Sequence, residues 1–321
     1  MFKKKFTTLA GSALLGLLAI GGQAFAENAY PNKAITLIVP YAPGGTTDMI
    51  ARALANGMSN HLKQTIVVEN KPGAAGSMGA NEMVNTKADG YRVALLPAGI
   101  FRQPYLQKTR YDPIEDLTYI AGFANYDFAI GVGENSPIKT IHDYVAYIQN
   151  NPNEMAVGTP GQFTGNQVVL VELLSEINGQ AVHVPFKSDS ESISALLGNQ
   201  IQAVVSTNIV IPFMESGKVR ILATAATERP EAYANVPTLK EAGYDVVVPS
   251  PLALGGPKNL PEEVVLRLEE AVKVTTESEA FKKAMADYGV QINFINHIDY
   301  TNLAIDTFAN EKSIVERLGT E

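Results

Sequence analysis

Two glycine-rich stretches of this chain contain the residue types best suited to binding chemistry. The first, at 40–48, reads PYAPGGTTD and lies between a β-branched run at 35–39 and an amphipathic run at 49–61. This order predicts a strand, a tight turn and a helix whose cap is Thr47 or Asp48. The first N–H groups of such a helix lack intrahelical partners and can bind an anion. The stretch is therefore a candidate carboxylate or phosphate site, with an ordinary βα turn as the alternative.

A nucleotide is disfavoured as the ligand of this loop. A Walker A loop places Lys and then Ser or Thr after its glycines, so that the ammonium reaches the phosphates. Thr46, Thr47 and Asp48 occupy that place in this chain.

The second glycine-rich stretch repeats the same logic. It reads NKPGAAG at 70–76, follows a strand pattern at 65–69 and precedes a helical pattern that starts at Ser77. Loops that follow neighbouring parallel strands meet at one edge of the sheet, where ligands bind in open α/β folds. Two helix starts that converge there would each favour an anion by about 0.3–1 kcal/mol.

Three further polar segments follow predicted strands. The stretch at 158–166 offers hydroxyls and an amide, the stretch at 185–190 a cation and hydroxyls, and the stretch at 206–208 three polar side chains. Each could instead be a capped loop or solvated surface, because lone lysines and small polar residues are mostly exposed.

Signatures of catalysis and metal binding are weak. The run AGSMG at 75–79 has alanine where a nucleophile elbow needs glycine, so we expect Ser77 to be a helix cap. Asp48 could be a general base, although a cap is the preferred interpretation. The four histidines are scattered and there is no cysteine, which supports neither a zinc site nor a Cys-His nucleophile. We expect no catalytic residue, no metal and no cofactor.

The start of the chain indicates export. Three lysines at 3–5, an apolar run at 9–20 and an A-x-A motif ending at Ala26 are typical of a cleaved signal peptide. No later segment has the length of a membrane span, and no cysteine is available for a lipid anchor. We therefore expect a soluble periplasmic protein. The net charge of −8 also argues against nucleic-acid binding.

Strand and helix patterns alternate from Ile35 onward, which predicts an α/β fold with mostly parallel sheets and helices on both faces. The length of 321 residues suggests two domains, and no linker divides them. We predict a signal peptide at 1–26, a discontinuous first domain at 27–125 plus 250–321, and an inserted second domain at 126–249. A helical block should end the chain, and one of its helices has an apolar face formed by Val264, Val265, Leu268, Ala271 and Val272.

Six motifs together resemble one protein family. They read IxLIVPYAPGGTTD at 35–48, VVENKPGAAG at 67–76, YDPIEDL at 111–117, VPFK at 184–187, ERP at 228–230 and VPTLKEAGY at 236–244. Each is weak alone. Their order and spacing over nearly the whole mature chain are similar to those of the periplasmic solute-binding receptors of tripartite tricarboxylate transporters, the Bug or TctC-like proteins.

The resemblance implies a type II venus-flytrap fold and a receptor without catalysis. Such a receptor captures a small organic carboxylate, for example a di- or tricarboxylate, and delivers it to membrane permease subunits; we expect it to be a monomer. The two glycine loops would hold one carboxylate through backbone amides and ordered waters, and the inserted domain would read the rest of the ligand. The ligand-binding candidates are Tyr41, Ala42, Gly44, Gly45, Thr46, Thr47, Asp48, Gly73, Ala74, Ala75, Gly76, Ala98, Arg102, Thr159, Gln162, Thr164, Asn166, Lys187, Ser188, Asp189, Ser206 and Asn208.

Some positions depart from the family, and some alternatives stay open. The loop at 158–166 lacks the histidine-leucine pair that often follows the threonine-proline of the family. Arg102 could pair a second carboxylate bidentately or make a surface salt bridge. The aromatic residues Tyr41, Phe101, Phe163 and Phe186 leave aromatic acids open as ligands. The alternative functions are a ligand sensor for a membrane kinase, and a periplasmic hydrolase that uses Ser77 or Asp48.

Overall fold

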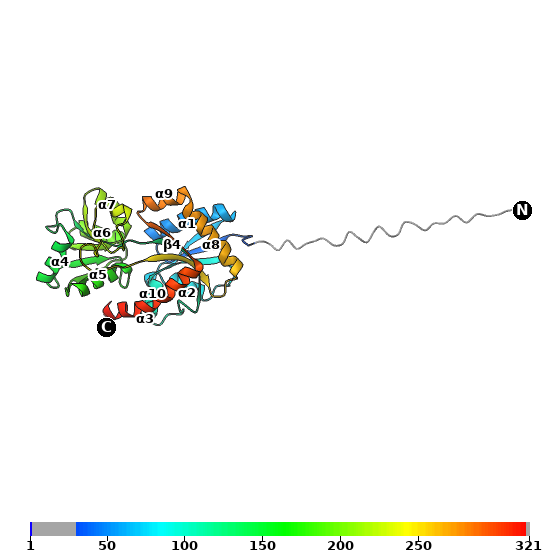
Figure 1. Ribbon diagram of the computed structural model, residues 1–321, viewed down its shortest axis with the longest axis horizontal. Coiled ribbons are helices and arrows are strands. Elements are labelled where there is room, and N and C mark those ends of the chain that lie inside the picture. Colours follow the sequence, from blue (N-terminus) through cyan, green and yellow to red (C-terminus); the bar gives the residue numbers. More distant parts are fainter. Residues whose placement is uncertain (2–29, 319–321) are drawn as a thin grey trace.

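The computed structural model describes residue 1 and residues 30–318, and it folds into two lobes, each built on one β-sheet (Figure 1). The predicted signal peptide therefore lies outside the described residues apart from its first residue. Among the described residues, no helix combines the length and the apolar character needed to cross a membrane.

The first lobe holds a six-stranded sheet in the order β11-β4-β10-β3-β1-β2. Four of its strands point the same way, and β10 and β11 run antiparallel to their neighbours. Its strands are β1 (Ile35–Val39), β2 (Ile66–Asn70), β3 (Arg92–Pro97), β4 (Leu117–Asn125), β10 (Pro251–Pro257) and β11 (Gln291–Asn296). Its helices are α1 (Thr46–Leu62), α2 (Met78–Met83), α3 (Gly99–Leu106), α8 (Glu262–Glu277), α9 (Glu279–Asp287) and α10 (His297–Leu318), with a 3₁₀ turn η1 (Ala74–Gly76).

The second lobe holds a five-stranded sheet in the order β7-β6-β8-β5-β9, in which only β5 runs against its neighbours. Its strands are β5 (Ala129–Gly133), β6 (Ala156–Thr159), β7 (Val182–Pro185), β8 (Ala203–Ser206) and β9 (Val219–Thr224). Its helices are α4 (Ile141–Asn150), α5 (Gly165–Glu176), α6 (Asp189–Leu197) and α7 (Ile211–Glu215), with 3₁₀ turns η2 (Asn208–Val210) and η3 (Glu231–Tyr233). The predicted two-domain α/β class is confirmed.

Two strands were absent from the sequence prediction. Strand β4 lies next to the edge strand β11, between β11 and β10, and its Gly122 leaves room for the Tyr300 ring. Strand β11 lies within the end of the chain, which was predicted as a helical block without a strand. The predicted apolar face of α8 is confirmed, since Val264, Leu268 and Ala271 are buried in the core with the rest of that face.

The chain passes between the lobes twice, and the two passages lie side by side. The N–H of Tyr126 donates to the Ser250 carbonyl at 3.0 Å, and the N–H of Ser250 donates to the Asn125 side chain at 3.0 Å. We propose that the domain boundaries at 125/126 and 249/250 run through these paired segments, which would then form the hinge.

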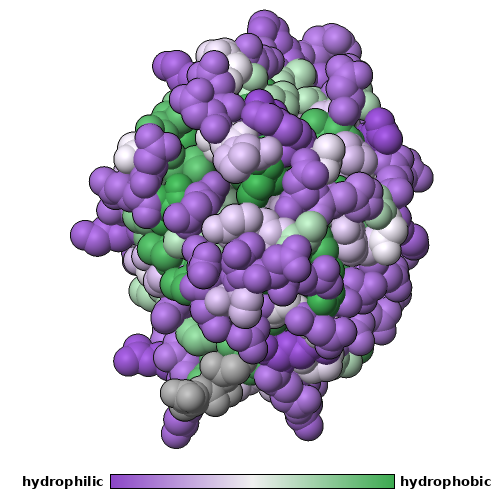
Figure 2. Space-filling model, turned by 90° about the vertical axis from the view of Figure 1, so that its left-hand side faces the viewer, coloured by the Kyte–Doolittle hydropathy of each residue, from purple (hydrophilic) through white to green (hydrophobic). Residues whose placement is uncertain are grey.

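Helix α10 of the first lobe also contacts the second lobe, without a chain crossing. Figure 1 shows it running below the first lobe, with its C-terminal end beneath α5 of the second lobe. There Arg317 pairs with Glu172 of α5 at 2.9 Å. The far end of the second lobe is covered mostly by hydrophilic residues, with apolar side chains only in small separate groups (Figure 2).

Candidate ligand site

A cavity of about 390 Å³ lies between the lobes, next to the two crossing segments. Its volume falls in the range of about 300–1,000 Å³ that is usual for small-molecule sites. Four helices begin at its wall: α1 and α3 from the first lobe, and α5 and α6 from the second. The cavity therefore collects several positive helix ends at one place.

The start of α1 is an uncapped helix terminus that faces this cavity. Gly45 is the N-cap in extended conformation and no side chain caps the helix. The first hydrogen bond of the helix runs from the N–H of Met49 to the Gly45 carbonyl at 3.1 Å. Among the described residues, the N–H groups of Thr46 and Thr47 have no hydrogen-bond partner, although both residues line the cavity. They are free to donate to an anion.

The predicted capping roles of Thr47 and Asp48 are wrong. The Thr47 hydroxyl shares a hydrogen bond of 2.6 Å with the Tyr126 hydroxyl. The buried Asp48 carboxylate accepts from the Gly44 N–H at 2.9 Å, Arg52 Nε at 3.0 Å and Asn70 Nδ2 at 2.9 Å. Burial raises the pKa of Asp48, but these hydrogen bonds outweigh it and hold the pKa below its ordinary value. Asp48 thus ties the two glycine loops together and does not line the cavity.

The second glycine loop contributes less than predicted. It forms the short 3₁₀ turn η1, and of its candidates only Ala75 reaches the cavity, while Gly73, Ala74 and Gly76 do not. The second helix start of this lobe is instead that of α3, at Ala98 and Gly99. The loop has a supporting role, because Gly76 has φ of +91° and a Cβ there would lie 2.5 Å from the Tyr41 hydroxyl.

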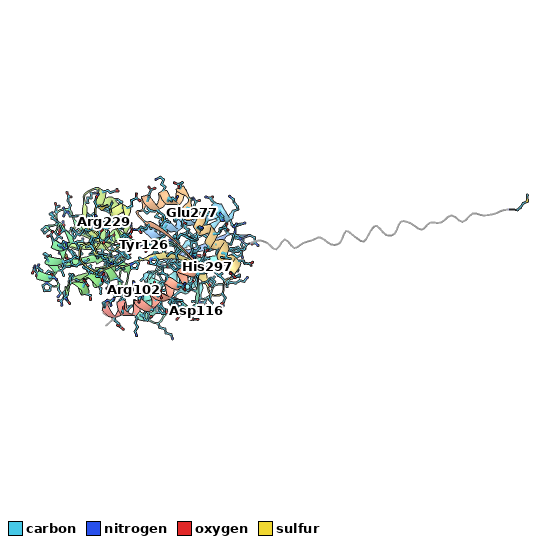
Figure 3. All side chains as sticks on the ribbon, viewed as in Figure 1. Arg102, Asp116, Tyr126, Arg229, Glu277 and His297 are labelled. Carbon is cyan, nitrogen blue, oxygen red and sulfur yellow. The ribbon has the colours of Figure 1, made fainter. Side chains whose placement is uncertain are left out.

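Arg102 lines the cavity but is already paired. Its Nε and Nη2 donate to the Glu311 carboxylate of α10 at 2.8 and 2.7 Å, and its Nη1 donates to the Phe163 carbonyl of the second lobe at 2.8 Å. Both side chains of the ion pair are almost fully buried, which contradicts a surface salt bridge. Bidentate pairing does occur, but with the protein's own carboxylate. Figure 3 places Arg102 and Tyr126 at the junction of the two lobes.

The second lobe contributes the starts of α5 and α6 to the cavity wall. The lining candidates there are Thr164, Asn166, Lys187, Ser188 and Asp189. Asn166 is anchored by a hydrogen bond from its Nδ2 to the Val205 carbonyl at 2.9 Å. Asp189 accepts from the hydroxyls of Ser206 at 2.9 Å and Thr207 at 2.8 Å.

Four predicted residues of this lobe do not line the cavity: Thr159, Gln162, Ser206 and Asn208. Thr159 is buried, and its hydroxyl is 2.6 Å from His183 Nε2. Asn208 donates from Nδ2 to the Gly289 carbonyl of the first lobe. Ser206 stands behind Asp189 as a hydrogen-bond donor. Thr159, Ser206 and Asn208 therefore make hydrogen bonds outside the cavity lining, and Gln162 is exposed.

The aromatic part of the wall was largely missed. Tyr41 lines the cavity as predicted, but Phe101, Phe163 and Phe186 do not, and Phe101 is a core residue. Tyr126 and Phe128, on the first crossing segment, take their place. The sequence predicted only that the inserted domain begins at 126 in that segment. Five other lining residues lie within the predicted stretches: Pro43, Pro160, Gly165, Ser190 and Thr207. The lining residues outside those stretches are Pro97, Gly99, Ile209, Val248, Pro249 and Ser250.

Comparisons with a family model, with sequence relatives and with solved structures agree on one family. Residues 50–320 match the description "Tripartite tricarboxylate transporter family receptor". A Cupriavidus necator protein, "UPF0065 protein in gbd 5'region", is 38% identical over 310 residues, covering 97% of this chain and 94% of the relative. A solved structure described as a periplasmic transporter is 30% identical with a TM-score of 0.84, covering 91% of this chain and 99% of that one.

Two more distant solved structures share the fold. Rpa4515 of R. palustris, solved with adipate, has 24% identity and a TM-score of 0.83 over 90% of this chain and 98% of its own. MatC of Rhodopseudomonas palustris, solved with malate, has 24% identity and a TM-score of 0.80 over 89% of this chain and all of its own.

Proposed function

Because this chain belongs to the receptor family of tripartite tricarboxylate transporters, whose members are solute-binding receptors, we propose that it binds one small organic carboxylate in the interlobe cavity and delivers it to membrane permease subunits. The observation that carries the proposal is the uncapped start of α1 at the cavity wall. The proteins solved with adipate and malate, which share the fold, give carboxylate ligands as precedents.

The proposed mode of binding uses main-chain donors. The N–H groups of Thr46 and Thr47 would donate to one carboxylate, and the start of α3 at Gly99 would add a second positive helix end. Hydrogen bonds to an ionised acceptor contribute about 1.5–3 kcal/mol each. A micromolar dissociation constant corresponds to about −8.2 kcal/mol, so a few such bonds with apolar contacts to Tyr126 and Phe128 are sufficient.

Side-chain cations have a smaller part in this proposal. The lining cations are Arg102 and Lys187. Arg102 is neutralised by Glu311, and Lys187 is exposed. The backbone is therefore the better candidate for holding the anion.

The hydrolase alternative finds little support at the cavity. Ser77 is 1% exposed and does not line the cavity, and the Asp48 carboxylate is occupied by three donors. Neither group is placed to attack or deprotonate a ligand bound there. Receptors of this family are periplasmic, and we propose export through cleavage of the segment 1–26 and action as a monomer.

A thermal-shift screen tests the proposal. Malate, adipate, succinate, citrate and several amino acids would be added to the purified mature chain at neutral pH. An acid at a hundredfold excess over its dissociation constant stabilises the fold by about 2.7 kcal/mol, which raises the melting temperature by several degrees. If no carboxylate in a broad panel raised the melting temperature, the proposed function would be wrong.

A further inference from the structure

Asp189 is a carboxylate in the wall of a cavity that is otherwise suited to anions. It is the first residue of α6, after the N-cap Ser188, and it lines the cavity from the second lobe. Its Oδ1 accepts from Ser206 Oγ at 2.9 Å and from the Thr207 N–H at 3.4 Å, and its Oδ2 accepts from Thr207 Oγ1 at 2.8 Å. A carboxylate has about four acceptor positions, so these three bonds fix its orientation and leave capacity for one more donor.

The Asp189 charge acts across the cavity on the first lobe. Burial raises the pKa of Tyr41 to about 12, with Arg102 lowering it and Asp189 raising it. Burial also raises the pKa of Tyr126, and Asp189 again adds to the rise. The Tyr126 hydroxyl is bonded to Thr47 at the start of α1. Asp189 and the start of α1 line the same cavity from opposite lobes.

The charge of Asp189 has no cationic partner in the protein. Within residues 30–318, no salt bridge involves Asp189. The Arg102 guanidinium is bound to Glu311, and the Lys187 side chain is exposed. The start of α6 and the hydroxyls stabilise the carboxylate only in part. Asp189 is partly buried in the cavity wall. A carboxylate shielded from water is costly without a counter-charge, so the ligand is the group that can supply one.

We propose that Asp189 binds an ammonium group of the ligand, so that the site takes a small zwitterion with its carboxylate at the start of α1 and its amine at Asp189. This inference rests on the proposed carboxylate-binding function. A dicarboxylate in the same orientation would bring a second negative charge against Asp189, which disfavours it. Asp189 then determines specificity by attracting amino acids and repelling simple diacids.

Isothermal titration of the wild-type chain with matched acids is the direct test. Aspartate is compared with succinate and glutamate with glutarate, because each pair differs by one added amine. 4-Aminobutyrate is compared with glutarate, in which a carboxylate replaces the amine. The expected result is at least tenfold tighter binding of at least one amino acid than of its diacid partner. Diacids that bind as tightly as every amino acid, or more tightly, would overturn the assignment. This comparison needs no variant.

The variant Asp189→Asn then tests whether Asp189 causes the preference for amino acids over diacids. The substitution keeps the shape of the side chain and removes its charge. It is expected to raise the dissociation constant of the preferred amino acid tenfold or more, while leaving the affinity for diacids unchanged or improved. Asp143→Asn, at an exposed capping residue outside the cavity, is the matched control. Circular dichroism and melting temperature show whether each variant is folded. A folded Asp189→Asn variant with unchanged relative affinities would refute the role of Asp189.

Failure of this inference and failure of the proposed function differ in outcome. If diacids bind and amino acids do not, the receptor function stands and the role of Asp189 falls. If neither class binds, the proposed carboxylate function itself falls.

Discussion

Replacing Thr46 with proline removes one backbone donor from the start of α1 and should leave the helix in place. Thr46 is the first helical residue, where proline is favoured because the N–H has no intrahelical acceptor. Gly45 before it has ψ of 167°, the extended conformation that a residue before proline prefers. Thr46→Ala is the matched control, since it removes the hydroxyl and keeps the N–H.

If the Thr46 N–H donates to the bound carboxylate, its loss costs about 1.5–3 kcal/mol. At about 1.4 kcal/mol per factor of ten, the dissociation constant of Thr46→Pro should be about 10- to 100-fold above that of Thr46→Ala. Isothermal titration with the acid found in the thermal screen gives both values. Urea denaturation should show free energies of unfolding within about 0.5 kcal/mol of each other. Two folded variants with equal affinity would refute the main-chain anion site.

Three further perturbations test the supports of the cavity. Gly76→Ala should cost about 1–3 kcal/mol in chemical denaturation and weaken ligand binding, because its Cβ would press on Tyr41; Gly133→Ala, with nothing within 4 Å of its Cβ, is the control, and equal losses in the two would contradict the packing explanation. Glu311→Gln should cost about 3–5 kcal/mol because it leaves Arg102 buried without a partner, whereas the double change Arg102→Met with Glu311→Leu should cost less in calorimetry; a double variant no more stable than Glu311→Gln would be the contrary result. Burial raises the pKa of Asp48, yet the Arg52, Gly44 and Asn70 hydrogen bonds keep it lowered overall, so the ionised form stabilises the fold above the unfolded-state pKa and this contribution is lost as the pH falls through the folded-state pKa. Urea denaturation below about pH 4 should therefore show a steeper loss for the wild type than for Asp48→Asn, and parallel curves would argue against it.

Local patterns in the sequence predicted the parts of the fold that depend on local structure. The sequence pattern of strand, glycine turn and helix around Gly44 and Gly45 predicted a free helix start. The apolar spacing in α8 predicted which of its faces is buried. Strand β4 was not predicted, and the packing of its Gly122 against the Tyr300 ring is seen only in the folded chain. That fit depends on a residue far along the chain.

The site shows the same division between local and distant causes. The residue type and position of Asp48 fit a helix cap or a ligand-binding residue. Only its tertiary hydrogen bond with Asn70 shows that it links the two glycine loops. Glu311 is 209 residues from Arg102, so no spacing rule connects them. Tyr126 joins the wall because the crossing segment passes beside α1. Sequence motifs predicted the uncapped helix start at the cavity wall, whereas the hydrogen-bond partners of Asp48 and Arg102 could be identified only in the folded chain.

The two lobes are joined by covalent chain crossings on one hand and by non-covalent contacts, some of them near helix α10, on the other. The two crossing segments are covalent and stay intact during any rotation. The separable contacts between the lobes include those of Arg102 with Phe163 and of Arg317 with Glu172 near α10, and that of Asn208 with Gly289 elsewhere. We propose that rotation about the two crossing segments opens the cavity and breaks these non-covalent contacts while the chain crossings stay intact.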